Sequence, residues 1–283
     1  MSTGEYQLLG DVLLAVVVAF FGLALPGYAL VRKWWPESGW NLGGNVGTSV
    51  IQPLDLVVAG GYVLMFVVGW KNLPEAAVKA SEKDLSLSAV VVGQLGMVVL
   101  AGVVPAVIFW RMEVREFFGL RWAGWRKVFW IAPLFVFAMM AVVSLQLGLG
   151  WKDWVEGRFG ARPQDTVTLL RESTDFVLVL GLAFSAVVIA PLTEELIFRG
   201  YLYPVVKRFS DRWFAAIFTG VFFGVIHFNV FSLPTLAVMG VVLVVLYEMT
   251  GSLWVPIACH AAFNATTVGA NLAPRILSFL SQS

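Results

Sequence analysis

Long apolar runs constrain this chain more than any other feature of its sequence. Several of them extend for about 20 residues, which is the length that a helix needs to cross the hydrocarbon core of a bilayer. Hydrophobic residues make up 59% of the chain and charged residues 13%, so the composition lies far from that of a soluble domain. The sequence therefore predicts an all-α, polytopic membrane protein, and it excludes a soluble globular or disordered chain.

The apolar runs predict about eight transmembrane helices. A removable signal peptide is not expected, because Glu5 and Asp11 precede the first run and no basic residue does. The bias of Lys and Arg favours a cytoplasmic location for the third connection and an outside location for both termini. The predicted spans cover residues 12–31, 50–70, 87–110, 128–149, 176–206, 214–228, 233–249 and 253–272.

Two connections between predicted spans have a distinctive composition. The connection 111–127 interleaves five basic residues with four aromatic ones, which favours an interfacial helix, although an ordinary cytoplasmic loop is the alternative. The connection 151–175 is the longest polar one and is a candidate lid. The net charge is +1 and no long basic block is present, so we expect membrane lipid as a partner and no nucleic acid.

Ionisable side chains inside apolar runs are costly in a membrane and usually have a function. Asp55 and Glu248 lie near the ends of predicted spans, where we expect them to be solvated. The others concentrate in three of the last four predicted spans. They are Glu194, Glu195, Arg199, His227 and His260.

Two adjacent carboxylates in the fifth predicted span point in different directions. Glu195 and Arg199 are four residues apart, so they share one helix face and can form a buried ion pair. Glu194 points about 100° away from Glu195, which leaves its carboxylate free to face a cavity. This division predicts a general base at Glu194. The alternative is a pair of charges at a span end, held by Arg199 and lipid headgroups.

Each of the two histidines lies one turn from a second side chain of interest. Phe223 precedes His227 on the same face and could fix its ring, although a histidine in an apolar helix can also be a satisfied core residue. His260 and Asn264 are four residues apart and aim two hydrogen-bond donors at one place, as an oxyanion requires. An interhelical hydrogen bond within the bundle is the alternative for this pair.

Together these residues predict a hydrolytic site. Glu194 and His227 can polarise one water molecule, while His260 and Asn264 can stabilise the oxyanion that forms when the water attacks an amide. No cofactor is expected. A zinc site formed by Glu194, His227 and His260 is the chief alternative, although the H-E-x-x-H pattern is absent. Cys259 is interpreted as a small packing residue.

The ordered motifs resemble the CPBP family of intramembrane endopeptidases, also called CAAX proteases and bacteriocin-processing or Abi proteins. The flanking sequences 191–202 and 250–257 agree with this resemblance, which covers roughly residues 176–272. The first 150 residues match only in being hydrophobic. The motifs are E-E-x-x-x-R at Glu194, Glu195 and Arg199, F-x-x-x-H at Phe223 and His227, and H-x-x-x-N at His260 and Asn264.

The resemblance implies an eight-span fold that encloses an intramembrane catalytic cavity. We expect a single integral membrane domain, residues 1–283, with a catalytic core at 176–272, in the cytoplasmic membrane of a prokaryote. The implied roles are a base at Glu194, a helper at His227, oxyanion donors at His260 and Asn264, and support from Glu195, Arg199 and Phe223.

The resemblance also implies the class of substrate. Members of the family cleave prenylated tails, process signalling or bacteriocin-like peptides, or remove sorting segments. We therefore expect a membrane-anchored or lipidated protein or peptide, cut near its end by a glutamate-dependent peptidase. The alternatives are a zinc-dependent metallopeptidase, a non-catalytic membrane scaffold or immunity protein, and a transporter. A transporter is disfavoured because the first four predicted spans hold almost no ionisable residues.

Overall fold

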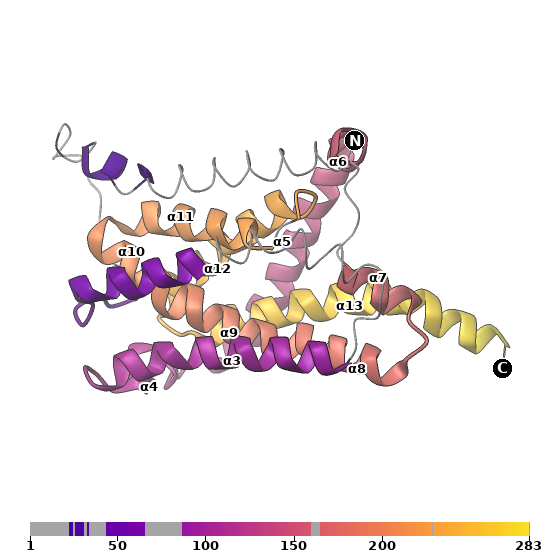
Figure 1. The fold of residues 1–283 in the computed structure, drawn as a ribbon, viewed down its shortest axis with the longest axis horizontal. Coiled ribbons are helices and arrows are strands. Elements are labelled where there is room, and N and C mark those ends of the chain that lie inside the picture. Colours follow the sequence, from indigo (N-terminus) through magenta and orange to yellow (C-terminus); the bar gives the residue numbers. More distant parts are fainter. Residues whose placement is uncertain are drawn as a thin grey trace.

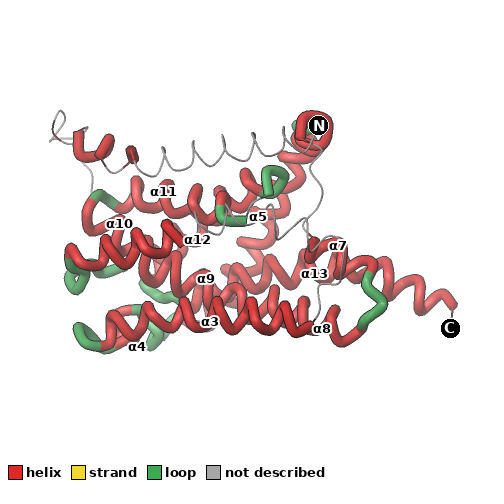
Figure 2. Tube along the Cα trace, viewed as in Figure 1, coloured by secondary structure: helices red, strands yellow, loops and turns green. Residues whose placement is uncertain are grey.

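The computed structural model describes residues 44–65, 87–159, 165–227 and 229–282, together with 23, 24, 26–30 and 33. In these ranges the chain consists of helices joined by turns and short loops, with no strand (Figure 2). The prediction of an all-α, polytopic membrane protein is confirmed. The helices lie side by side as a bundle, and most run along its long axis (Figure 1).

Four helices in the described ranges are long and apolar enough to cross a membrane. Two shorter apolar helices, Pro53–Met65 and Arg212–Val225, coincide with parts of the second and sixth predicted spans. The first predicted span lies almost entirely outside the described residues, so the total of about eight stays a prediction. The four candidate spans are Leu87–Ile108, Trp125–Gly148, Phe176–Phe209 and Leu233–Thr250.

The helix bounds follow the apolar runs closely. Polar residues mark the helix boundaries. At the start of α11 (Arg212–Val225), the Asp211 carboxylate accepts hydrogen bonds from two backbone N–H groups of the first turn. Besides the helix Pro53–Met65, the labelled helices outside 176–209 include α3 (Leu87–Phe109), α4 (Val114–Phe117), α5 (Val128–Gly148), α6 (Trp151–Phe159), α7 (Asp165–Glu172), α12 (Leu233–Thr250) and α13 (Trp254–Gln282).

The segment from Phe176 to Phe209 is one composite helix with two widened turns. It comprises α8 (Phe176–Phe184), the π-helical segment Ser185–Ile189, α9 (Ala190–Ile197), the π-helical segment Phe198–Leu202 and α10 (Tyr203–Phe209). A proline follows each widened turn, at the second position of the next α-helix. Since proline has no N–H to donate, it leaves carbonyls of the preceding turn without a helical partner. Such π-turns are frequent at functional sites.

Glycines bring α11 and α12 into close backbone contact. A Cβ atom added at Gly240 would lie 2.6 Å from the Cα of Gly220, and one added at Gly220 would lie 2.8 Å from the backbone nitrogen of Val241. Small residues allow helices to approach in this way in a membrane, where packing and hydrogen bonds drive their association. The approach places the backbone of α12 beside the composite helix.

One end of the bundle holds two buried ionic networks. Asp55 is fully buried and bonds to Arg111 at 2.5 Å and to the Tyr201 hydroxyl at 2.7 Å. Glu248 accepts hydrogen bonds at 2.5 Å from both the buried Lys207 ammonium and the Tyr203 hydroxyl. The prediction that Asp55 and Glu248 are solvated is therefore wrong, because their partners come from helices distant in the sequence.

The connection 111–127 differs from the predicted interfacial helix. It contains the four-residue helix α4 and a single 3₁₀ turn at Trp125–Lys127, with an irregular stretch between them. Gly119 has a φ of +61°, which L side chains rarely adopt and which ends the first turn. Basic and aromatic residues therefore face several directions.

Candidate active site

Three side chains from separate parts of the chain meet at one carboxylate oxygen. Glu194 lies on α9, His227 lies in the turn that follows α11, and His260 lies on α13. Oε2 of Glu194 is 3.9 Å from Nε2 of His227 and 3.9 Å from Nε2 of His260. These side chains are 15%, 22% and 3% exposed, so the point where they meet is largely enclosed and opens on the side of His227.

The ring of His227 is fixed by the helix end that precedes it. Its Nδ1 lies 2.7 Å from the carbonyl oxygen of Phe223, which can only accept a hydrogen bond, so Nδ1 carries the proton. The Phe223 ring lies 4.8 Å from the imidazole in an edge-on arrangement. In the neutral ring Nε2 is therefore a hydrogen-bond acceptor, and it is the atom that faces Glu194.

The ring of His260 is fixed by the second carboxylate. Its Nδ1 lies 2.8 Å from Oε1 of Glu195, and the same oxygen accepts a hydrogen bond at 2.8 Å from Arg199. An ion-paired carboxylate only accepts hydrogen bonds, so Nδ1 of His260 also carries a proton. In the neutral ring the Nε2 of His260 is an acceptor, and it can donate a hydrogen bond only when the ring is an imidazolium.

Arg199 is buried and satisfied by three kinds of contact. It pairs with Glu195, it donates at 3.0 Å to the carbonyl of Gly240 on α12, and its guanidinium lies 4.5 Å from the centre of the Phe223 ring. The predicted ion pair between Glu195 and Arg199 is therefore present. Arg199 also links this pair to α12, a helix that carries neither histidine. The carbonyl of Gly240 reaches Arg199 because α12 packs closely at its glycines.

Asn264 is held by a carbonyl of the first widened turn. Its amide nitrogen donates at 2.8 Å to the carbonyl of Ala186. That carbonyl has no helical donor, because the N–H of Ala190 bonds to Ser185 instead and Pro191, one residue further on, has no N–H. The Asn264 amide has two N–H groups, so a second one remains for another acceptor.

The loop after His227 is tied to the corner between α5 and α6. Gln146 donates at 2.5 Å to the carbonyl of Phe231 and accepts a hydrogen bond from Thr235. The Trp151 indole donates to the same Phe231 carbonyl at 3.1 Å. Two helices that precede the composite helix in the chain, α5 and α6, therefore fix the loop that follows His227.

The arrangement can bind a small polar molecule between Glu194 and the two histidines. Oε2 of Glu194 is buried and makes no hydrogen bond to the part of the protein that the structure describes. Its 3.9 Å separations from the two Nε2 atoms exceed hydrogen-bonding distance. Three acceptors that face one point can share the hydrogens of a water molecule.

A zinc ion would require Glu194, His227 and His260 to lie closer together than they do. Zinc ligands lie about 2.0–2.2 Å from the metal, so two ligands of a tetrahedral site are about 3.3 Å apart. The separations of 3.9 Å would require Glu194 and both histidines to move inward. Among the described residues, no group of three or more His, Cys, Asp or Glu side chains is arranged to hold a metal ion. With these separations the three side chains do not fit a zinc ion.

The structure brings the predicted residues together and adds partners that the sequence did not reveal. Glu194, His227 and His260 meet directly, whereas Asn264 reaches the site region through Ala186. The backbone carbonyls of Ala186 and Gly240 and the side chain of Gln146 were missed. For the Ala186 carbonyl the sequence did offer one signal, Pro191, because a proline inside a helix leaves a carbonyl of the preceding turn without its N–H donor. Cys259 is buried among apolar residues, as expected of a packing residue.

Comparisons with known proteins identify the part of the chain that carries this site. Residues 176–266 match the family model described as type II CAAX prenyl endopeptidase Rce1-like. A protein of Bacillus subtilis strain 168, named "Putative membrane peptidase YdiL", is 30% identical over 95 residues. That match covers 34% of this chain and 38% of the relative. No solved structure matches the chain. The resemblance seen in the motifs is confirmed for this part of the chain.

Proposed function

We propose that this integral membrane protein is an intramembrane endopeptidase, because residues 176–266 match the family model described as type II CAAX prenyl endopeptidase Rce1-like. The observation that carries the proposal is the meeting of Glu194, His227 and His260 at one enclosed point. The reaction is hydrolysis of a peptide bond near the end of a membrane-anchored or lipidated protein or peptide. The catalytic core is residues 176–272, within a single membrane domain.

In the first step Glu194 acts as the general base. A water molecule donates one hydrogen to Oε2 of Glu194 and the other to Nε2 of His227, an acceptor because its Nδ1 proton is bonded to Phe223. As the water oxygen attacks the substrate carbonyl carbon, its proton passes to Glu194. The same carboxylic acid then protonates the leaving amine, which restores the carboxylate. Removal from bulk water strengthens each of these interactions.

His260 and Asn264 stabilise the tetrahedral oxyanion in this proposal. Donation by Nε2 of His260 requires the imidazolium form, and the Glu195 carboxylate bonded to Nδ1 offsets the charge of that form. Asn264 contributes its second N–H while the first stays bonded to Ala186. Glu195 and Arg199 do not touch substrate; they orient the imidazole of His260.

The test is the isosteric substitution Glu194→Gln in the full chain, reconstituted in lipid vesicles. The probe is a fluorogenic farnesylated peptide that ends in a CAAX sequence. We expect the variant to lose cleavage while remaining folded and inserted, because glutamine cannot accept the proton of the water. The matched control is Glu156→Gln, which removes an exposed carboxylate on α6 and should leave the rate unchanged.

Several outcomes discriminate among the alternatives. Equal cleavage by Glu194→Gln, or no cleavage by the unaltered protein, contradicts the proposal and favours a non-catalytic membrane protein. Treatment with a zinc chelator separates the two peptidase mechanisms. Unchanged activity is expected here, whereas loss of activity that added zinc restores would establish the metallopeptidase instead.

A further inference from the structure

The connection between α3 and α5 lies where a membrane meets water. It joins two candidate spans, which end at Ile108 and begin at Trp125. Tryptophans at both margins project outward, with Trp110 85% exposed and Trp130 82% exposed. Exposed tryptophans at span ends are typical of the headgroup level of a bilayer. The residues between these margins therefore face lipid headgroups.

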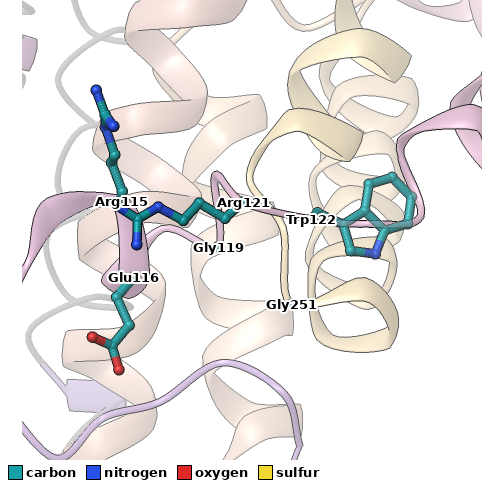
Figure 3. A pocket seen from close by; sticks show the side chains of 6 residues that line it. All are labelled: Arg115, Glu116, Gly119, Arg121, Trp122 and Gly251. Carbon is teal, nitrogen blue, oxygen red and sulfur yellow. The ribbon is translucent and has the colours of Figure 1, made fainter.

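A cavity opens on this connection and is distinct from the candidate active site. Its volume is about 360 Å³, and Arg115 and Arg121 provide its basic groups. Both side chains lie on one side of Gly119 and Gly251, and the ring of Trp122 lies on the other (Figure 3). A second cavity of about 250 Å³ shares Arg115 and includes Glu113. The full lining of the first is Arg115, Glu116, Gly119, Arg121, Trp122 and Gly251.

The basic groups at this cavity lack buried counter-charges. Arg111, on the same connection, pairs with the fully buried Asp55. Arg121 pairs only with Glu113, and these two side chains are 68% and 50% exposed, so the pair is weak. Arg115 is exposed and makes no ion pair within the described ranges. Glu116 lines the cavity as its one acidic side chain. Arg126 and Lys127, later in the same connection, are also exposed.

The backbone beside the cavity is fixed by hydrogen bonds to the turn between α12 and α13. The carbonyl of Phe118 accepts a hydrogen bond at 3.0 Å from the N–H of Leu253, and the Trp254 indole donates at 3.3 Å to the carbonyl of Leu120. At Gly119 an added Cβ would clash with the Gly251 carbonyl at 1.8 Å. The connection is therefore docked against the turn between α12 and α13.

We propose that this cavity binds the phosphate of an anionic phospholipid such as phosphatidylglycerol. Guanidinium groups bind phosphate oxygens with two parallel hydrogen bonds, and indole rings favour the headgroup layer. A zwitterionic lipid would bring its own ammonium group to a positive surface, which favours the anionic class. The acyl chains would extend along the exposed apolar surface of α5, which includes Phe129 and Leu134. The inference is independent of the proposed peptidase activity.

The test measures lipid affinity directly. The full chain is delipidated in detergent and titrated by native mass spectrometry with phosphatidylglycerol or phosphatidylcholine of matched acyl chains. Arg115→Gln combined with Arg121→Gln should weaken binding of phosphatidylglycerol by about thirtyfold, as expected for two charges near an anionic headgroup, and should leave phosphatidylcholine binding unchanged. Arg115→Lys with Arg121→Lys should weaken binding less than the glutamine pair, because lysine keeps the charge but not the two parallel hydrogen bonds.

The matched control removes two charges beyond the other end of α5. Lys152→Gln with Arg158→Gln, both in exposed positions on α6, should leave phosphatidylglycerol affinity unchanged. Arg115→Gln alone keeps the Arg121–Glu113 pair intact and so tests the site even if the double variant is unstable. Unchanged affinity in Arg115→Gln, or an equal loss in the control, overturns the proposal. Displacement of the lipid by excess inorganic phosphate would identify a free anion site and would also overturn it.

Discussion

At the scale of single residues, neighbouring carboxylates divide the work of the site. Glu194 and Glu195 each keep a buried Oε2 atom without a hydrogen bond among the described residues, but Oε1 of Glu195 binds both Arg199 and His260. The difference follows from their positions on one helix, because adjacent side chains point about 100° apart. The Glu194 carboxylate thus faces the two histidines, and the Glu195 carboxylate determines which nitrogen of His260 carries the proton.

The burial of the Glu195–Arg199 pair gives a prediction about stability. Glu195→Gln leaves a buried arginine without its counter-charge and should lower the free energy of unfolding by about 3–5 kcal/mol. The pair Lys152–Glu156 has the same i,i+4 spacing but is about half exposed. Glu156→Gln should therefore cost less than about 1 kcal/mol. Thermal unfolding of both variants in the same detergent measures the difference, and equal losses would contradict this account.

The hydrogen bond between Asn264 and Ala186 gives a prediction about catalysis. Asn264→Ala should lower kcat by roughly 10²–10³ and change KM little, as expected when an oxyanion donor is lost. Steady-state kinetics with the farnesylated peptide separate the two constants. Asn271→Ala is the control, because Asn271 lies two turns further along α13 and bonds to Arg171. A rise in KM with kcat unchanged would assign Asn264 to substrate binding instead.

At the scale of elements, the widened turns of the composite helix connect helix geometry to the site. Each α-helix that follows such a turn has a proline at its second position, Pro191 or Pro204. The first frees the carbonyl that holds Asn264. An ordinary α-helix would direct that carbonyl into its own hydrogen-bond ladder, so the proline creates an acceptor for α13.

Pro191→Ala tests this link between helix geometry and activity. Alanine supplies the missing N–H, so the turn can become regular and the Ala186 carbonyl can lose its bond to Asn264. We expect stability to be equal or higher, because a proline is removed from a helix interior, and we expect kcat to fall. Pro204→Ala removes the second proline and should leave kcat nearly unchanged. Equal effects of the two substitutions on kcat would contradict the assignment.

At the scale of the whole molecule, charge distinguishes the two ends of the bundle. The end that holds α4 and the turn between α10 and α11 carries most of the described basic residues (Figure 1). Two of these, Arg111 and Lys207, are neutralised by carboxylates inside the bundle, while Arg115 and Arg121 remain at the surface. An excess of surface Lys and Arg is typical of the cytoplasmic side.

Cysteine labelling can test this orientation. The native Cys259 is buried, so it should not react with a membrane-impermeant maleimide. Lys127→Cys and Lys152→Cys place single exposed thiols near opposite ends of α5. In intact bacterial cells we expect labelling at position 152 and, at position 127, labelling only after permeabilisation. The reverse pattern would place the basic end outside.

Much of the fold could be predicted from the sequence because apolar runs and spacing are local properties. The third, fourth, fifth and seventh predicted spans agree closely with helices long enough to cross a membrane. The motif residues were also identified, since i,i+4 spacing places side chains on one face of a helix. Of the two interpretations left open for the connection 111–127, the interfacial helix does not form, because Gly119 with its positive φ ends the first helical turn.

The sequence by itself determined that the chain is a helical membrane protein and that Glu195 and Arg199 share one helix face. Hydrophobicity and helical periodicity act along the chain, so they can be read without knowing what lies nearby. Only the tertiary structure decided that Asp55 is buried, that Glu248 pairs with Lys207, that Glu195 bonds to His260, and that the Ala186 carbonyl holds Asn264. Those contacts join residues far apart in the chain, and their distances depend on how closely the helices pack.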